Sequence, residues 1–200
     1  MAVAVPVAPP SAPQTLSWED YINSPLTKEP YEIIEGELFL MPSPEADHQW
    51  ISRVLLLAID NYVMANGRGV VLTAPFDVVI RRAPRLQTRQ PDILFISAER
   101  RGIRGRKELR GIRRLEFAPD LVVEILSPGE IRGELAGKLR DYAEIGAREI
   151  WIVTAQGETV EVLNLQEAAY VRGGLYGIGD SVQSAVLPGF SLAVETIFAE

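Results

Sequence analysis

The chain has 200 residues, of which 47% are hydrophobic and 24% are charged, and its formal net charge is −7. This length suits one domain with a substantial core, and no apolar run approaches the roughly 20 residues that a membrane-spanning helix needs. The absence of cysteine excludes disulfides and thiolate metal sites, and the net charge argues against a generally basic nucleic-acid-binding protein.

The first 16 residues predict a flexible, proline-rich tail. The opening stretch MAVAVPVAPPSAPQ contains four prolines and has no basic residue ahead of its apolar run, which argues against a secretory signal. We therefore expect a cytoplasmic protein in which residues 17–200 form a single domain.

Three elements are predicted in the first third of the chain. Ser17 is a good N-cap for a short helix. Residues 31–41 alternate between apolar and polar side chains and predict a hairpin that turns at Glu35–Gly36. Apolar residues at spacings of three and four then predict a long helix, which Asn66–Gly67 ends.

The remainder predicts mainly strands, together with a second long helix over residues 131–145 that Gly146 closes. Two segments near the C-terminus, REIWIVT and ETVEVLNL, predict a hairpin across Gln156–Gly157, and a short helix follows near the end. Other strands are expected at 69–73, 76–81, 91–96 and 119–126. The fold class is therefore α/β or α+β, with a mixed β-sheet flanked by two main helices.

Charge is unevenly distributed along the chain. Residues 81–114 contain twelve Lys or Arg and three acidic residues, a net charge of +9. This asymmetry indicates either a site for a polyanion or an ion-paired contact with an acidic face of another subunit. The sequence leaves both alternatives open.

Glu124 stands in the middle of the apolar strand PDLVVEIL. A lone buried carboxylate costs several kcal/mol unless it is paired, protonated or bound to a metal. Asp120 shares its strand face but lies about 13 Å away. If residues 91–96 pair antiparallel with 119–126, Asp92 comes to lie beside Glu124, about 4.8 Å away across the ladder. We therefore predict that Asp92 and Glu124 converge.

Two converging carboxylates provide the hard oxygen ligands that suit Mg²⁺ or Mn²⁺. Alternatively, Lys138 or an arginine neutralises Glu124, or Glu124 lies on a solvated face. A glycosidase would also need two acids about 5–10 Å apart, but no aromatic-rich pattern supports a sugar-binding cleft. Pattern alone does not decide among these alternatives.

Five sequence blocks, in this order, carry a resemblance to a known family: YEIIEGELFLMPSPEADH, QPDILFI, APDLVVEILSP, KLRDYAEIGAREIWIV and LPGF. Over residues 17–198 the chain resembles the restriction-endonuclease-like family often labelled Uma-two, within the PD-(D/E)XK nuclease superfamily. This resemblance implies a restriction-endonuclease-like fold and a Mg²⁺-dependent endonuclease that hydrolyses phosphodiester bonds of DNA.

The same resemblance implies roles for individual residues. Asp92, Glu124 and the backbone carbonyl of Ile125 would bind the metal, with Mn²⁺ as a substitute for Mg²⁺. The superfamily lysine normally stands two residues after the acid, where this chain has Leu126, and Lys138 on the following helix matches its displaced position in the closer family. A surface ion pair with Glu134, four residues earlier on the same helix face, is the alternative for Lys138.

Further residues are candidates for supporting roles. His48 matches a histidine usual in the family and would contact phosphate or a metal-bound water, with a capping or surface residue as the alternative. Glu35 and Glu134 would support the site, although a turn role also explains Glu35. Thr154 stands where family members commonly carry an acid, which weakens any second metal ligand there. The candidates for phosphate contacts are Arg89, Arg104, Arg106 and Arg132.

We expect DNA as the substrate and a homodimer as the assembly. A second hypothesis belongs to a different class: a catalytically inactive nuclease fold that acts as a binding or assembly module. In that case a salt bridge would hold Glu124, and the basic segment would dock on an acidic subunit face.

Overall fold

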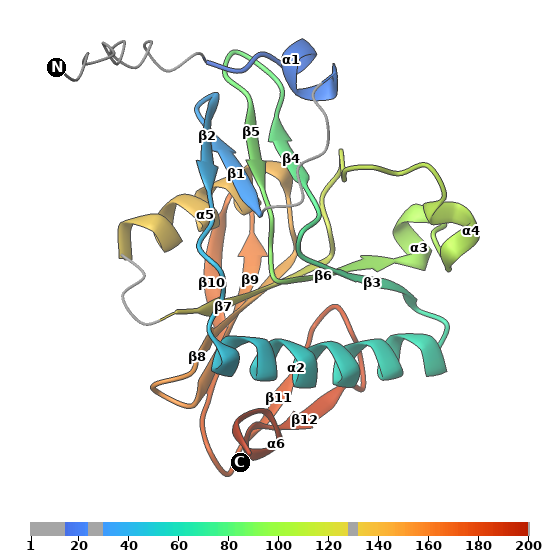
Figure 1. Cartoon of the computed structure of the whole chain (residues 1–200). Helices are drawn as coiled ribbons and strands as arrows, with labels where there is room; N and C mark the ends of the chain where they lie inside the picture. The colour runs from blue at the N-terminus through green and yellow to red at the C-terminus, as the bar shows by residue number, and fades with distance from the viewer. Residues whose placement is uncertain (1–14, 24–29, 128–131, 200) are drawn as a thin grey trace, which may run out of the picture.

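Six strands form the main sheet of the computed structural model, which describes residues 15–23, 30–127 and 132–199 (Figure 1). Their order is β10-β9-β8-β7-β6-β3. The bounds are β3 (Gly69–Thr73), β6 (Ile93–Ser97), β7 (Leu121–Leu126), β8 (Glu149–Thr154), β9 (Thr159–Gln166) and β10 (Ala169–Tyr176). The predicted strands near 69–73, 91–96 and 119–126 thus lie side by side.

The sheet is mixed because its central strand β7 has two kinds of neighbour. It pairs antiparallel with β6 and parallel with β8, whereas β9 pairs antiparallel with β8 and with β10. The parallel pair needs a crossover, and α5 (Arg132–Ile145) supplies it between β7 and β8. The predicted β8–β9 hairpin lies on the far side of this crossover.

Two helices cover the two faces of the sheet, as Figure 1 shows. Helix α2 (Ala46–Ala65) buries one residue per turn, namely Ile51, Leu55, Ile59 and Val63, against the odd-numbered residues of β6 and β7 and the short helix α6 (Val194–Phe198). On the other face, Tyr142 of α5 packs with even-numbered residues of the same strands. The predicted α+β class with two main helices is therefore confirmed.

A second sheet of four strands lies next to α5, in the order β2-β1-β5-β4. It contains the predicted hairpin of β1 (Tyr31–Ile34) and β2 (Glu37–Leu40), with a turn at Glu35–Gly36. The remaining strands are β4 (Val78–Arg81), which matches the strand expected at 76–81, and the three-residue β5 (Gln87–Arg89). The sequence pattern did not predict β5. Helix α1 (Trp18–Asn23) begins after Ser17, whose hydroxyl accepts a hydrogen bond from the Asp20 backbone amide. Near the C-terminus, β11 (Ser181–Gln183) and β12 (Ser191–Ala193) form a two-stranded sheet that precedes α6.

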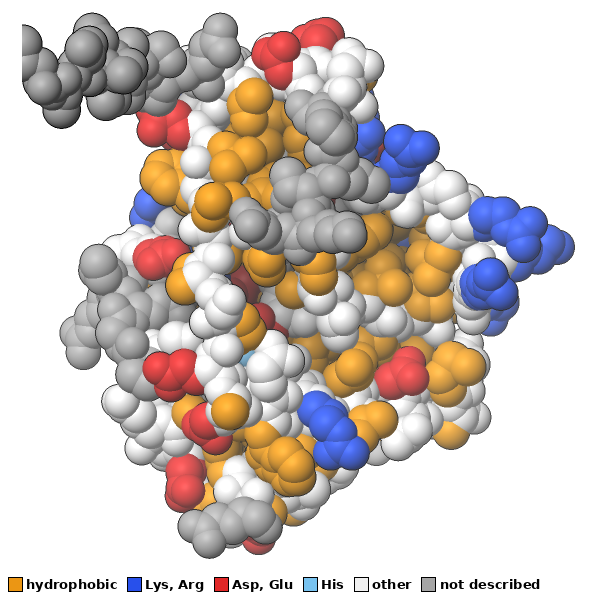
Figure 2. Space-filling model, in the orientation of Figure 1, with side chains coloured by type: hydrophobic (Ala, Val, Ile, Leu, Met, Phe, Trp, Pro, Cys, Tyr) orange, Lys and Arg blue, Asp and Glu red, His pale blue; other side chains and the backbone are white. Residues whose placement is uncertain are grey.

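The basic connection between β6 and β7 folds into two short helices, α3 (Ala98–Arg101) and α4 (Arg106–Leu109). Lys and Arg side chains gather along the edge that these helices form (Figure 2). Part of the positive charge of segment 81–114 is compensated within the chain. Ion pairs join Arg82 to Glu116 and Arg100 to Asp120.

No helix in the described ranges is long and apolar enough to cross a membrane.

The buried face of α2 gives a stability prediction. Leu55 is fully buried whereas Leu57, two residues later, is 45% exposed. Leu55→Ala should lower the free energy of unfolding by about 2–5 kcal/mol because it leaves a cavity. Leu57→Ala should change it by less than about 0.5 kcal/mol. Urea unfolding at constant m-value measures both, and equal losses would contradict the packing of α2 on the sheet.

Candidate active site

Asp92 and Glu124 come from neighbouring antiparallel strands. Ile93 pairs with Val123, so the residue before β6 lies opposite the next residue of β7. The Ile125 backbone amide donates a hydrogen bond of 2.7 Å to Asp92 Oδ2. The predicted pairing of 91–96 with 119–126 is confirmed, and it brings the two carboxylates to the same end of the β6–β7 pair.

Glu124 is buried, and α5 supplies its hydrogen-bond partners. Lys138 Nζ lies 2.7 Å from Glu124 Oε2, and the Tyr142 hydroxyl donates a hydrogen bond of 2.5 Å to Oε1. Lys138 and Tyr142 stand four residues apart, so one face of α5 presents both donors to the strand. Of the alternatives that the sequence left open, neutralisation of Glu124 by Lys138 is the arrangement observed.

The groups around Glu124 have opposing effects on its pKa. Burial raises the pKa of its carboxyl above the ordinary value, the Lys138 ammonium lowers it, and the nearby carboxylates of Asp92 and Glu32 raise it further. Burial and the Glu124 carboxylate also raise the pKa of Tyr142, which keeps its hydroxyl a donor. Displaced pKa values of this kind are common at functional sites.

His48 lies on the other side of Asp92, in the first turn of α2. Its Nε2 is 3.3 Å from Asp92 Oδ1. The hydrogen bond with Asp92 raises the pKa of His48, while burial opposes the rise. Figure 2 shows acidic side chains recessed in a hollow beside the histidine. His48 therefore lies beside Asp92, and its expected contact with phosphate or a metal-bound water stays a prediction.

A second buried network adjoins the first and was not predicted from the sequence. Arg89 of β5 donates to Glu32 of β1 at 2.5 Å and, through Nε, to Asp141 of α5 at 2.7 Å. Gln87 also donates to Asp141 at 2.7 Å. The charge of Glu32 influences Glu124, so the smaller sheet contributes to the electrostatics of the site. Glu32 is a charged residue within the otherwise apolar strand YEII. This is the one sequence signal that could have indicated the second network.

Three predicted site residues lie in other surroundings. Arg89 is 3% exposed and bound to two carboxylates, so the expected contact with phosphate is wrong for this residue. Glu35 occupies the β1–β2 turn with φ 52° and pairs with Arg81 at 2.5 Å, which corresponds to the turn alternative. Glu134 is exposed on α5 whereas Lys138 is buried. A surface pair with Glu134 therefore does not describe Lys138.

Two further predicted phosphate contacts are also separate from Asp92 and Glu124. Arg104 and Arg106 are exposed on the α3–α4 connection, beyond the other end of β6. The side chain of Arg132 lies outside the described part of the structure. Their expected role in DNA binding stays a prediction.

The donor set at Asp92 and Glu124 fits a hard divalent cation that retains water. Within the described ranges, no group of three or more His, Asp or Glu side chains is arranged to hold a metal ion. Mg²⁺ commonly binds through one or two carboxylates, waters and substrate phosphates. The partly exposed Asp92 and the buried Glu124 would supply the two carboxylates. The Ile125 backbone, close to both Asp92 and His48, adds a carbonyl oxygen nearby.

Comparison with known proteins decides the family. The sequence model of the family Uma2, described as "Putative restriction endonuclease", matches residues 18–195. The chain belongs to the Uma2 family. The resemblance that the five sequence blocks indicated is therefore confirmed, and membership supports a nuclease function in general.

A solved structure shares the fold of this Uma2 chain. It is described as "a putative nuclease belonging to DUF820 from Anabaena variabilis ATCC 29413". The TM-score is 0.73, with 92% of this chain and 97% of that chain covered and 17% of residues identical. At this identity the likeness shows the fold alone. No curated protein sequence matches this chain.

The buried Arg89 network gives the second prediction. Arg89→Met should lower the free energy of unfolding by about 3–5 kcal/mol, because it leaves Glu32 and Asp141 buried without their shared cation. Arg85→Met is the control, since Arg85 is exposed and lies 3.9 Å from Glu35; it should cost less than about 0.5 kcal/mol. Urea unfolding compares the two variants. A loss below about 1 kcal/mol for Arg89→Met would show that the network is not desolvated.

Proposed function

We propose that this chain is a Mg²⁺-dependent endonuclease that hydrolyses phosphodiester bonds of DNA. The observation that carries the proposal is the convergence of Asp92 and Glu124 at one end of the β6–β7 pair, with the Lys138 ammonium 2.7 Å from Glu124. The family resemblance implies two acids from neighbouring strands and a lysine from the helix that follows them. Asp92, Glu124 and Lys138 have this arrangement. Mn²⁺ is expected to replace Mg²⁺.

Asp92, Glu124 and the Ile125 carbonyl would hold the metal. A bound divalent cation would lower the pKa of a water molecule and stabilise negative charge on the phosphate. The excess of acid around the site supports a cation there. Among the residues that the structure describes there, four carboxylates, those of Glu32, Asp92, Glu124 and Asp141, meet two permanent cations, Arg89 and Lys138.

Lys138 is the side chain that we expect to act on the substrate. Its Nζ is a point charge on a flexible stem, and α5 holds it beside Glu124. Beside Glu124, the ammonium would be placed to attract a phosphate oxygen of the substrate. We propose that His48 holds the Asp92 carboxylate in orientation through Nε2, at 3.3 Å.

One observation favours a second candidate function, a binding or assembly module without catalysis. Lys138 and Tyr142 already satisfy both oxygens of Glu124, so the buried carboxylate does not require a metal. The position two residues after Glu124, where the superfamily carries lysine, is Leu126. Metal binding and cleavage separate the two candidates.

The first test concerns the metal. Calorimetry with Mn²⁺ should show binding to the wild type that Asp92→Asn and Glu124→Gln abolish, because each removes a charged ligand. Glu134→Gln removes a charge of the same sign from the exposed face of α5 and should bind as the wild type does. The same Asp92 and Glu124 variants should fail to nick plasmid DNA. A wild type that neither binds Mn²⁺ nor nicks DNA would favour the non-catalytic module.

The second test concerns Lys138. Lys138→Met should lower kcat for DNA cleavage by about 10²–10³-fold, because charge developing on the phosphate loses its stabilising cation. Mn²⁺ binding should persist, since Lys138 is not a ligand and its removal leaves Glu124 available. Single-turnover cleavage and calorimetry on the same preparation measure both quantities. Unchanged kcat would remove Lys138 from the chemistry.

The third test concerns pH. The pKa of Glu124 lies above its ordinary value of 4.5, and that of His48 lies above 6.5. A cation bound to Glu124 must displace the proton that this carboxyl retains, and its charge would also oppose protonation of His48. The affinity for the cation should therefore rise as the pH rises above 4.5, by about tenfold per pH unit for each proton released. Calorimetry in buffers of different ionisation enthalpy counts the protons. An affinity independent of pH would contradict the raised pKa values.

A further inference from the structure

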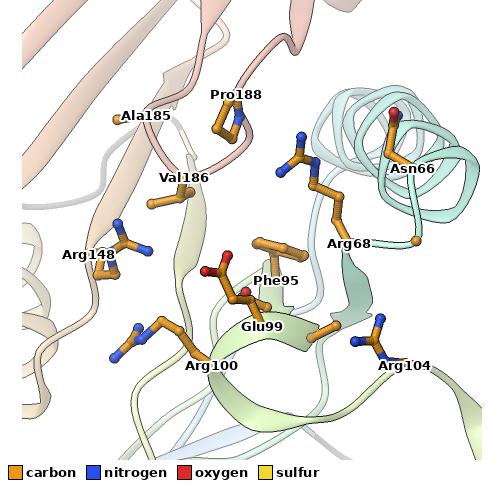
Figure 3. Close-up of a pocket in the computed structure, with 13 residues that line it drawn as sticks. Asn66, Arg68, Phe95, Glu99, Arg100, Arg104, Arg148, Ala185, Val186 and Pro188 are labelled. Carbon is orange, nitrogen blue, oxygen red and sulfur yellow. The ribbon is translucent and has the colours of Figure 1, made fainter.

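A second charged pocket lies at the opposite end of β6 from Asp92 (Figure 3). Its volume is about 440 Å³. The end of α2, the start of α3, the beginning of β8 and the segment 185–188 surround it. Five residues separate Asp92 from Ser97, which corresponds to about 16 Å along the strand. The pocket is therefore distinct from the site described above.

The lining of this pocket is basic. It contains four arginines and a single acid, Glu99; the arginines are Arg68, Arg100, Arg104 and Arg148. They come from three separate parts of the chain, and only Arg100 and Arg104 belong to the basic segment 81–114. Apolar side chains of Phe95, Val186 and Pro188 form other parts of the wall. Guanidinium groups beside an apolar wall suit an anion carried by a larger molecule.

Asp120 positions two of the arginines. Its carboxylate is completely buried, accepts a hydrogen bond from the Ser97 amide at 2.8 Å, and lies 2.6 Å from Arg100 and 3.5 Å from Arg148. Each guanidinium has five N–H donors. A single shared carboxylate therefore leaves most donors of Arg100 and Arg148 available to another acceptor. These side chains are 36% and 50% exposed, and so a ligand can reach them.

Arg68 provides an independent indication of a ligand. Within the described residues, its Nε is one of two buried side-chain nitrogens without a hydrogen-bond partner. A buried N–H without an acceptor is uncommon in native proteins because its desolvation is not compensated. In Figure 3 the Arg68 side chain points into the pocket from the end of α2, facing the side from which Glu99 and Arg148 enter. The guanidinium end of Arg68 is thus the part that would meet an anion in this space (Figure 3).

We propose that this pocket binds a terminal phosphate group, either of a mononucleotide or of the end of a nucleic acid strand. A phosphate monoester carries a charge of about −1.5 to −2 at neutral pH, which matches a lining with four arginines and one glutamate. The volume falls in the range of about 300–1,000 Å³ that is typical of small-molecule sites. Binding needs neither the metal nor Asp92 and Glu124, so it is independent of the proposed nuclease activity.

Glu99 is the acidic residue in the lining, and its charge disfavours a bound anion. Its carboxylate points into the space between Arg68 and Arg148 (Figure 3). Its negative charge would repel a phosphate that enters this space. A phosphate must displace it or bind beside it. Replacement of Glu99 should consequently strengthen binding, whereas replacement of the arginines should weaken it.

The test measures binding to the full chain in the presence of EDTA, which prevents cleavage. The probes are a nucleoside 5′-monophosphate and a short oligonucleotide with either a 5′-phosphate or a 5′-hydroxyl. We expect a phosphorylated probe to bind, Arg68→Met to weaken it by about tenfold or more, and Glu99→Gln to tighten it. Arg172→Met is the matched control, because Arg172 is exposed on β10 and paired with Glu161; it should bind as the wild type does.

The outcomes are distinguishable. Binding of the mononucleotide assigns the phosphate to a free nucleotide, whereas binding of the 5′-phosphorylated strand alone assigns it to a strand end; either supports the pocket. Binding should persist in Asp92→Asn, so a loss of cleavage there does not affect it. Absence of preference for phosphorylated probes, or equal affinity in Arg68→Met at unchanged thermal midpoint, would overturn the proposal.

Discussion

A carboxylate buried in the central strand of a sheet has to be compensated, and the compensation of Glu124 determines how α5 packs. Uncompensated, the charge would cost several kcal/mol. The Lys138 ammonium and the Tyr142 hydroxyl satisfy its two oxygens from successive turns of one helix face. Because both donors are buried, α5 can neither rotate nor slide along the sheet without leaving a charge unpaired. The requirement that fixes the fold here also fixes the geometry of the candidate site.

The same helix connects the two sheets. Three residues beyond Lys138, Asp141 accepts hydrogen bonds from Arg89 and Gln87 of β5, and Arg89 in turn binds Glu32 of β1. Charges from the main sheet, α5 and the smaller sheet therefore act on one another over short distances. The acid at the site is only partly balanced by these fixed cations, which is the condition under which a protein site favours a cation from solution.

Sequence predicted the part of the site that depends on strand geometry. The alternation of side chains and an antiparallel pairing were sufficient to bring Asp92 beside Glu124. The role of Arg89 was predicted wrongly because charge along the chain does not reveal burial. Strand β5 has three residues, QTR, without apolar alternation, so no local pattern indicated that Arg89 points inward to Glu32. The pocket beyond Ser97 combines arginines from distant segments, and such combinations follow only from the tertiary fold.

The two ends of the β6–β7 pair show how surroundings give two similar acids different roles. Asp120 and Glu124 stand four residues apart, both buried and both bound to cations. Around Asp120, two arginines and a backbone amide converge on one carboxylate. The positive charge is in excess there, and the acid serves to position donors for an anion. Around Glu124, the carboxylates of Asp92 and Glu32 add negative charge that Lys138 opposes, and this is the setting in which we propose that the acid binds a cation. Under the two proposals made above, opposite charge at opposite ends of one strand pair would attract a terminal phosphate at one end and a divalent cation at the other.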